Sequence, residues 1–218
     1  MKLYNSLGPN PRKVRMFLIE KGIDIEFVEY DMLLGAENRK ESYLSKNPGG
    51  QIPALELDNG TVIGETVVIC EYLEEQFPSP TLIGSTPQER ADHRQWQRRI
   101  ELNITEHLYN AFRYSVGIDI FKERMTVIPE AVEGLSNIVQ TKLGWLNSQM
   151  EGKEYITGKD MRLVDIILYC ALDFGAGVNQ TIPSDLTNIN NWFERMHGRE
   201  SAKNTYHADS EKMKMRGI

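Results

Sequence analysis

The feature that most constrains this fold is a change in hydrophobic periodicity near residue 80. Before it, short apolar runs with the two-residue period of strands alternate with runs that have helical spacing. After it, apolar residues recur at helical spacing over long stretches, and no convincing strand pattern appears. The sequence therefore predicts an α/β plus all-α chain, with a small α/β domain over residues 1–80 and an all-helical domain over residues 87–218.

Proline and glycine mark the ends of elements in the first 80 residues. Pro11 suits the first position of a helix, where an N–H would have no helical partner, and Gly22 is typical of a helix end. Ile23, Ile25 and Phe27 alternate with acidic residues, which is the period of a strand. The predicted elements are a strand at 2–4, a helix at 11–22, a strand at 23–27, a short helix at 38–44, an Asn-Gly hairpin over 54–63 and a helix at 66–77. In this order they make a mixed sheet with helices packed on it.

The later part of the chain has clear helix signals. Thr86-Pro87-Gln88-Glu89 is a capping box with proline at the first helical position, so a helix begins there and extends to about Tyr114. The stretch 163–174 is apolar nearly all round, which favours a helix buried inside a bundle. Further helices are predicted at 129–150 and 189–196, whereas the tail from Arg199 is polar and weakly specified.

Composition and charge argue against several classes of function. No apolar run approaches the ~18 residues that a membrane helix needs. The formal net charge of −6 argues against bulk nucleic-acid binding. Cys70 and Cys170 are too far apart in sequence for a zinc-type spacing, and the four histidines, without metal spacing, are predicted at the surface. We therefore predict a cytoplasmic protein with no metal site, nucleic-acid partner or membrane partner.

Four local motifs occur along this pattern of domains. They are Gly8-Pro9-Asn10-Pro11-Arg12-Lys13-Val14-Arg15, Asn47-Pro48-Gly49-Gly50-Gln51-Ile52-Pro53-Ala54-Leu55, Gly64-Glu65-Thr66 and Gly158…Asp165. Together they resemble the cytosolic glutathione S-transferase family over almost the whole chain, and most of all a fungal-type and bacterial subgroup that lacks the usual catalytic Tyr, Ser or Cys. The resemblance implies a thioredoxin-like N-terminal domain that holds glutathione, a helical C-terminal domain that shapes the second-substrate site, and a homodimer.

The segment Gln51-Ile52-Pro53 stands where a loop enters a predicted strand. A proline at such a point is a candidate cis peptide, with an ordinary trans proline as the alternative. The resemblance implies that the cis bond lets Ile52 pair its backbone with the cysteinyl unit of glutathione, as an added strand would. It also implies Arg39 and Gln51 as partners of the glycyl carboxylate, although Arg39 could equally be a solvated charge on a surface helix.

Glu65 and Thr66 stand at the start of the helix predicted at 66–77. Backbone N–H groups at a helix N-terminus are unpaired, and the helix dipole favours an anion there. The resemblance implies that the γ-glutamyl carboxylate of glutathione binds to Thr66 while Glu65 pairs with the γ-glutamyl ammonium. The alternative is that Thr66 only caps its helix.

The group that faces the glutathione sulfur is the weakest part of the match. Matching Arg12 to the family's arginine in the first helix places Gly8 where the serine classes carry their hydroxyl. Ser6 and Tyr4 remain nearby candidates, although neither falls on that position. Because proline has no N–H, the amides of Asn10 and Arg12 are the donors that remain. Asn10 could also cap the helix and offer its side-chain NH₂ to the sulfur, or act only as a cap.

Phe112, Arg113 and Tyr114 are predicted to line the second-substrate site. The predicted function is a glutathione transferase of the detoxification type, with glutathione as co-substrate and a small hydrophobic electrophile as the other partner. Glutathione-dependent disulfide reduction is one alternative, suggested by Pro9-Asn10 and the missing hydroxyl. A non-catalytic glutathione-binding or scaffold protein of the same fold is another, suggested by Gly8.

The helix predicted at 163–174 carries one further family feature. Asp165 matches a buried aspartate at a helix start that serves folding. The usual Ser or Thr three residues earlier is Arg162 here. This departure puts a capping box at that helix in doubt without touching the glutathione site.

Overall fold

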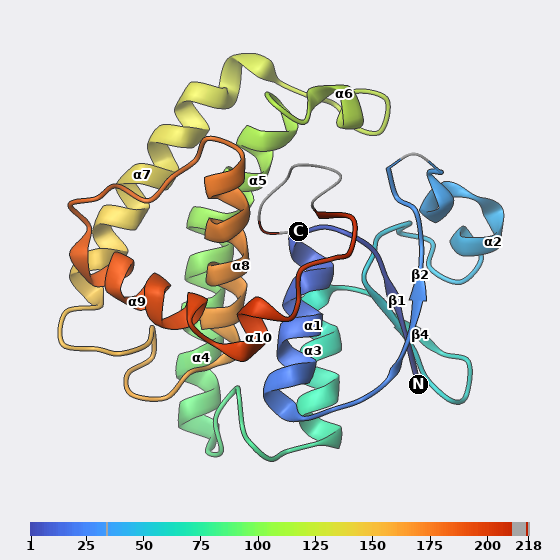
Figure 1. Ribbon diagram of the computed structural model, residues 1–218, viewed down its shortest axis with the longest axis horizontal. Coiled ribbons are helices and arrows are strands. Elements are labelled where there is room, and N and C mark those ends of the chain that lie inside the picture. The colour runs from blue at the N-terminus through green and yellow to red at the C-terminus, as the bar shows by residue number, and fades with distance from the viewer. Residues whose placement is uncertain (34, 211–216, 218) are drawn as a thin grey trace. The chain divides into compact units, whose positions relative to one another are not determined.

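The structure is a computed structural model that describes residues 1–33, 35–210 and 217 (Figure 1). Contacts divide these residues into two compact units. Unit 1 contains Met1–Leu82 and residues 200–210, and unit 2 contains residues 83–199 with Gly217. Unit 1 holds a four-stranded mixed sheet with helices, whereas the named elements of unit 2 are all helices. The predicted fold class, α/β followed by all-α, is confirmed.

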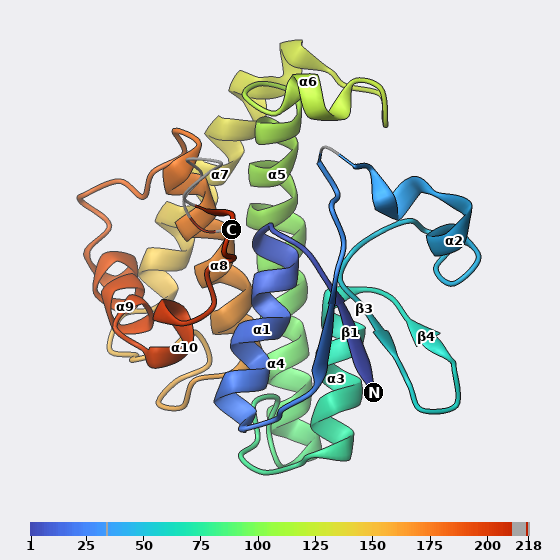
Figure 2. The same cartoon turned by 45° about the vertical axis from the view of Figure 1, so that its right-hand side comes forward.

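Unit 1 has a thioredoxin-like arrangement, with strand order β2-β1-β3-β4. Strand β1 is parallel to β2 and antiparallel to β3, which is antiparallel to β4. Its elements are β1 (Lys2–Asn5), α1 (Pro9–Lys21), β2 (Glu26–Glu29), the 3₁₀ turn Glu37–Arg39, α2 (Glu41–Leu44), β3 (Ala54–Glu56), β4 (Val62–Ile63), α3 (Thr66–Gln76) and α10 (Glu200–Lys203). Figure 2 shows α1 and α3 on one side of the sheet and α2 on the other.

The pleat of β1 divides the core of unit 1 between the two faces of the sheet. Tyr4 and Ala54 belong to a buried cluster with Tyr43 of α2 and Ile52. Leu3 and Leu55 are fully buried, and their side chains point to the opposite face because successive residues of a strand alternate. That face is the one covered by α1 and α3 (Figure 2). The sheet is therefore buried on both faces.

The second strand begins three residues later than the sequence predicts. The reason is how α1 ends. Gly22 adopts the left-handed conformation and donates to the Ile19 carbonyl, while the Ile23 N–H donates to the Leu18 carbonyl at 2.9 Å. This Schellman motif uses Ile23 to close the helix, so the apolar alternation starts before the chain reaches the sheet at Glu26.

Unit 2 is built around α8, whose residues from Leu163 to Gly175 are all buried. Its elements are α4 (Pro87–Ile100), the π-helical turn Glu101–Thr105, α5 (Glu106–Arg113), α6 (Ile118–Phe121), the 3₁₀ turn Pro129–Ala131, α7 (Val132–Gln149), α8 (Leu163–Gly177) and α9 (Thr187–His197). The predicted helix from residue 87 to 114 is thus interrupted by one π-helical turn. The capping box that opens it is confirmed, since Glu89 N–H donates to Thr86 Oγ1 at 3.2 Å and Glu89 accepts from the Thr86 N–H at 3.0 Å.

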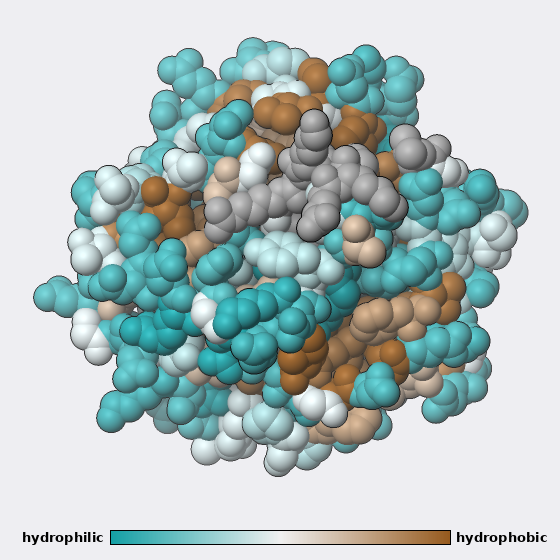
Figure 3. Space-filling view, in the orientation of Figure 1, coloured by the Kyte–Doolittle hydropathy of each residue, from teal (hydrophilic) through white to brown (hydrophobic). Residues whose placement is uncertain are grey.

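Each unit keeps most of its polar residues outside. The face of the molecule in Figure 3 is largely hydrophilic, with hydrophobic residues in separate patches. None of the described helices is long and apolar enough to cross a membrane.

His93 of α4 is buried, with 1% of its surface exposed, so its predicted surface position is wrong. Trp96 and Ile100 follow at helical spacing and are buried on the same face. Burial, helped by the charges of Arg162 and Arg94, lowers the pKa of His93 to about 4 from its ordinary 6.5. The folded protein therefore keeps this ring neutral where the unfolded chain would protonate it.

We expect this histidine to make stability depend on pH. Between pH 7 and pH 5 the unfolded chain gains a proton at residue 93 that the folded protein refuses, so stability falls as pH falls. The two pKa values correspond to a loss of about 2 kcal/mol over that interval. Urea unfolding of the wild type and His93→Leu at both pH values measures it. The variant should lose less stability on acidification; an equal loss in both proteins would contradict the assignment.

Candidate functional site

The sheet register brings three segments with predicted binding residues to one end of unit 1. Tyr4 lies opposite Ala54, and Leu55 lies opposite Ile63. Continuing these antiparallel registers places Ile52-Pro53 between the end of β1 and Gly64-Glu65. The turn before α1, the loop before β3 and the start of α3 therefore meet at the same edge of the sheet.

The first turn of α1 begins at Gly8, whose backbone has φ 123° and ψ 160°. A side chain is strained at this φ, so glycine suits the position. The Arg12 N–H donates to the Gly8 carbonyl at 3.2 Å, so it is not the available donor that the sequence suggested. Since Pro9 and Pro11 have no N–H, the Asn10 amide is the remaining backbone donor of this turn.

Asn10 lies in the second position of α1, and its side chain does not cap the helix. Its Oδ1 instead accepts a hydrogen bond from Lys13 Nζ at 2.9 Å. With the oxygen held in this way, the Nδ2 group of Asn10 is oriented as the donating end of the side chain. This half-buried amide stands at the positive end of the helix dipole.

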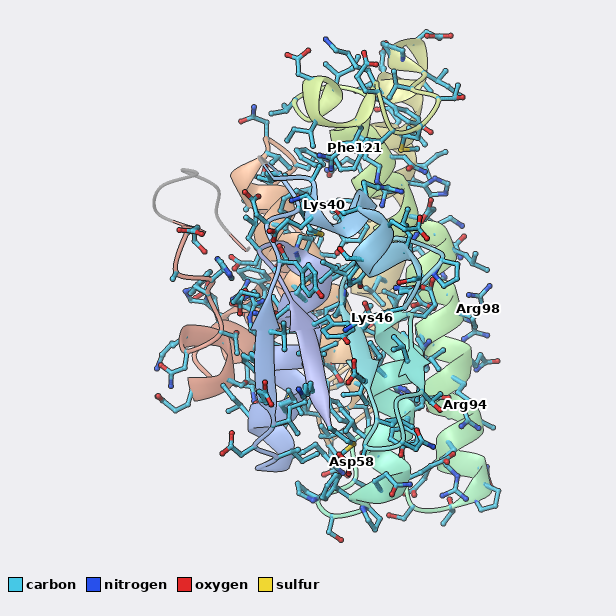
Figure 4. All side chains as sticks on the ribbon, turned by 90° about the vertical axis from the view of Figure 1, so that its right-hand side faces the viewer. Lys40, Lys46, Asp58, Arg94, Arg98 and Phe121 are labelled. Atoms are coloured by element: carbon cyan, nitrogen blue, oxygen red, sulfur yellow. The ribbon has the colours of Figure 1, made fainter. Side chains whose placement is uncertain are left out.

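The two hydroxyl candidates are engaged in other contacts. Ser6 is buried, and its Oγ donates to the Tyr30 carbonyl at 2.6 Å. The Tyr4 hydroxyl donates to the Glu56 carboxylate and accepts from Lys46 Nζ at 2.9 Å (Lys46 is labelled in Figure 4). Burial and the bond to Glu56 raise the pKa of Tyr4. Tyr4 therefore lies with the cluster beneath α2, while Ser6 fixes the end of β1 to the end of β2.

The Ile52–Pro53 peptide bond is cis, which confirms the prediction for this proline. The loop before it is held by polar side chains that the sequence analysis did not select. The Gln51 carbonyl accepts from the Tyr43 hydroxyl at 2.6 Å and from Asn47 Nδ2 at 2.8 Å. The Gln51 side chain itself is exposed. The loop thus has a fixed backbone and presents Gln51 outward.

Arg39 comes close to the same loop. A Cβ atom on Gly50 would stand 3.1 Å from Arg39 Nη1, and Gly50 has φ +60°. Glycine at this position therefore permits the close approach of the guanidinium. Asn38 Nδ2 donates to the Gly50 carbonyl at 2.6 Å, which ties the turn that carries Arg39 to the loop. Arg39 and Gln51, separate in sequence, are brought together as exposed polar groups.

Glu65 precedes α3 with φ 66° and ψ 119°, a left-handed φ that is uncommon for a residue with a side chain. Such conformations cost about 1–3 kcal/mol and concentrate at ligand-binding sites. Neither Glu65 nor Thr66 caps the helix with its side chain. The first helical bond runs from the Ile69 N–H to the Glu65 carbonyl, so the preceding N–H groups from Thr66 onward point out of the helix. An exposed carboxylate and a helix N-terminus thus lie side by side.

The three residues predicted for the second substrate lie in unit 2. Phe112 belongs to its core, packed edge to face on Phe174 with ring centroids 4.9 Å apart. Arg113 donates to Asn110 Oδ1 at 2.9 Å, and Tyr114 is half-buried at the end of α5. Among the described residues, no cluster of His, Cys, Asp and Glu could hold a metal ion.

Comparison with known proteins agrees with this arrangement. Residues 7–76 match the family described as glutathione S-transferase, N-terminal domain, and residues 106–200 match glutathione S-transferase, C-terminal domain. A glutathione S-transferase domain-containing protein from Marinobacter aquaeolei has a crystal structure with 31% identity and a TM-score of 0.86, covering 93% of this chain and 100% of that one. This chain therefore belongs to the glutathione S-transferase family.

Two further relatives carry more specific names. A glutathione S-transferase of class Gtt2 from Vibrio parahaemolyticus is 30% identical with a TM-score of 0.79, over 94% of this chain and 97% of that one. Glutathione S-transferase 2 of Saccharomyces cerevisiae is 28% identical over 203 residues, which are 90% of this chain and 84% of that protein. The resemblance found in the sequence motifs is confirmed at the level of the family.

Proposed function

We propose that this chain binds glutathione at the site in unit 1, stabilises its thiolate and conjugates it to a small electrophile. The observation that carries the proposal is the convergence of the α1 N-terminus, the cis-proline loop and the α3 N-terminus at one edge of the sheet. These segments offer complementary groups for a short, charged peptide. Chains that share this architecture are named glutathione S-transferases.

Each part of glutathione is assigned to one segment. The γ-glutamyl carboxylate binds the N-terminus of α3 at Thr66, and the γ-glutamyl ammonium pairs with Glu65. The backbone of Ile52, before cis-Pro53, pairs with the cysteinyl unit as an added strand. Arg39 and Gln51 bind the glycyl carboxylate, since both are exposed beside the same loop.

In this proposal, no Tyr, Ser or Cys side chain at the start of α1 activates the thiol. A free thiol has a pKa of about 8.5, so becoming mostly thiolate at neutral pH requires a shift of about two units, or ~2.7 kcal/mol. A helix N-terminus supplies up to ~2 kcal/mol, and a hydrogen bond to a charged group supplies ~1.5–3 kcal/mol. The backbone N–H and the Nδ2 group of Asn10, at the positive end of the α1 dipole, are therefore sufficient to lower the thiol pKa by about two units. Ser6 supports them by holding the turn before the helix.

The transfer itself needs no further cofactor. The thiolate attacks an electrophilic carbon, a carbon–sulfur bond forms, and a leaving group such as halide departs with the bonding electrons. The thiol proton goes to solvent before the attack. Phe112, Arg113 and Tyr114 are the proposed lining of the second-substrate site. The proposed second substrate is a small hydrophobic electrophile, so the proposed role is detoxification.

A homodimer forms part of the same proposal. Val68 of α3 is 51% exposed and Leu102 of the π-helical turn is 54% exposed. Exposed apolar side chains of this size suit burial against a second copy of the chain.

Loss of Glu65 should weaken glutathione binding. Glu65→Ala leaves the γ-glutamyl ammonium without its carboxylate, a loss of about 1.5–3 kcal/mol, or at least tenfold in dissociation constant. Calorimetric titration with glutathione measures the change, with circular dichroism to check that the fold is intact. Glu75→Ala, an exposed glutamate on the same helix, serves as the control. Equal affinity in the wild type and Glu65→Ala would remove Glu65 from the site.

Asn10 should control the acidity of the bound thiol. Asn10→Ala is expected to raise the pKa of bound glutathione by about one unit, because one charge-assisted hydrogen bond is partly replaced by water. Asn10→Asp keeps an oxygen for Lys13 but places a carboxylate near the sulfur, so the pKa should rise further. Thiolate absorbance near the ultraviolet edge, titrated with pH, gives each value. A larger shift in Ser6→Ala than in Asn10→Ala would reverse the assignment.

Parallel assays separate the proposed function from its alternatives. Retention on immobilised glutathione, followed by turnover of an aryl halide, supports conjugation. Turnover of a hydroxyethyl disulfide alone would instead indicate a disulfide reductase, the alternative suggested by Pro9-Asn10 and the missing hydroxyl. Glutathione binding without either activity would indicate a binding or scaffold protein.

A further inference from the structure

The segment from Glu200 to His207 belongs to unit 1 and packs on the helix that opens the candidate site. Two buried arginines of α1 donate hydrogen bonds to the backbone of this segment. Arg12 Nη2 donates to the Ala202 carbonyl at 3.0 Å, and Arg15 Nε donates to the Thr205 carbonyl at 3.0 Å. The Arg12 guanidinium also stacks over the Tyr206 ring at 4.1 Å from its centroid. The late segment thus covers the side of α1 from which these arginines project.

Arg15 connects this segment to the turn that precedes α1. Its Nη1 donates to the Ser6 carbonyl and to Asn5 Oδ1, each at 2.9 Å. Asn5 is 2% exposed, and its Nδ2 donates to Glu29 Oε1 at 2.6 Å. The other oxygen of Glu29 lies 3.1 Å from Nε2 of His207. A chain of polar contacts therefore leaves the late segment at Thr205, passes through Arg15, Asn5 and Glu29, and returns to it at His207.

The turn inside this ring leads directly into the first turn of α1, which carries the proposed thiol-binding group, Asn10. Residues 5–8 lead from the last residue of β1 into α1, and the orientation of the Asn10 amide depends on where this turn places the first residues of the helix. A hydrogen bond from the Asn10 amide to the thiolate would lose strength steeply when its angle or distance changes. Contacts made with charged groups are about twice as strong as neutral ones, so the ring holds the turn firmly.

We propose that residues 202–207 form a clamp that fixes the turn 5–8 and the first turn of α1, with Arg15 and His207 as positioning residues for the glutathione thiolate. The thiolate part rests on the proposed function. The mechanical part, the rigidity of the turn, stands on the contacts alone. Neither residue touches the substrate in this proposal, because both act through the turn.

Backbone hydrogen exchange on the full unliganded chain tests the mechanical part. In His207→Ala and Arg15→Lys, the Arg12 amide, which donates to the Gly8 carbonyl in the first turn of α1, should exchange about tenfold faster than in the wild type. Lysine keeps the charge at residue 15 but cannot reach three acceptors with the fork of a guanidinium. Lys203→Ala is the matched control, because this exposed lysine of the same segment pairs with Glu200. Its exchange in the first turn should equal that of the wild type.

The pH titration of bound glutathione tests the thiolate part. His207→Ala and Arg15→Lys should raise the thiol pKa by about 0.5–1 unit, while binding of S-methylglutathione, which has no thiol, stays within about twofold. A segment with only a structural role would lower the melting temperature and leave the thiol pKa unchanged. Unchanged exchange in the two variants would overturn the inference. If the wild type binds glutathione, a thiol pKa that is the same in the variants as in the wild type would also overturn it. A wild type that binds no glutathione would refute the proposed function instead, and the exchange measurement alone would then decide the clamp.

Discussion

Replacing Glu74 with alanine is expected to reduce the free energy of unfolding by about 3–5 kcal/mol. Glu74 Oε2 lies 2.7 Å from Lys21 Nζ, and the two side chains are 6% and 0% exposed. The other oxygen of Glu74 accepts from Thr81 Oγ1 and from the Leu82 N–H, each at 2.8 Å. Removing the carboxylate leaves a buried ammonium and a buried N–H without this acceptor. The cost comes mainly from the charge that is left behind.

Urea unfolding measures this loss, and a double variant makes the reason testable. Lys21→Met with Glu74→Met removes both charges, so it should lose clearly less stability than Glu74→Ala alone. The exposed pair of Asp119 and Lys122, 2.7 Å apart, provides the control, and Asp119→Ala should have no measurable effect. A double variant less stable than Glu74→Ala would show that the attraction between the charges outweighs the cost of leaving one alone.

Asp165→Ala should destabilise the helical unit by about 4 kcal/mol. The side chain is fully buried at the start of α8. Its oxygens accept from the Arg162 N–H at 2.9 Å, the Ile156 N–H at 3.0 Å and Trp192 Nε1 at 2.8 Å. Loss of the carboxylate removes the acceptor of the Arg162 N–H at the helix start, worth about 1 kcal/mol, and leaves two more buried donors unpaired at ~1–3 kcal/mol each.

Thermal and urea unfolding of the purified chain measure this change, with Asp165→Asn as the matched variant. Asparagine keeps the shape and one acceptor oxygen, so it should retain part of the stability that alanine loses. If Asp165→Ala unfolded like the wild type, the three contacts would contribute nothing to stability. The Asp165 half of the capping box is present although Arg162 replaces the usual Ser or Thr, because Asp165 accepts from the backbone N–H of residue 162. The Arg162 side chain has no acceptor, so the returning bond of a full capping box is missing.

The order of strands and helices could be predicted because it follows from local periodicity and from proline and glycine. The Asn-Gly hairpin and the start of α3 were predictable for the same reason, since each depends on a few neighbouring residues. At Pro53 the neighbouring residues left both cis and trans open, and the resemblance of the surrounding motif favoured the cis bond that is found. The assignment of Glu65 and Thr66 to the start of α3 needed only the Gly-Glu-Thr motif and the apolar run after it.

Contacts with backbone groups could not be predicted in this way. Arg12 and Arg15 bind the carbonyls of Ala202 and Thr205, and a carbonyl is the same in every residue. The polar tail after residue 199 therefore gave no sign of its place in unit 1. His93 was a different case: its spacing to Trp96 and Ile100 was visible, but a histidine alone does not show which face of a helix it occupies.

Unit 1 is discontinuous in sequence, since residues 83–199 are inserted between its sheet and its last segment. During synthesis, the arginines of α1 leave the ribosome long before the carbonyls that they bind. At about 5–20 residues per second, the delay amounts to many seconds, far longer than a helix or hairpin needs to form. The contacts that hold α1 in unit 1 therefore form only after residues 202–207 have been synthesised, however early the sheet and α1 themselves fold.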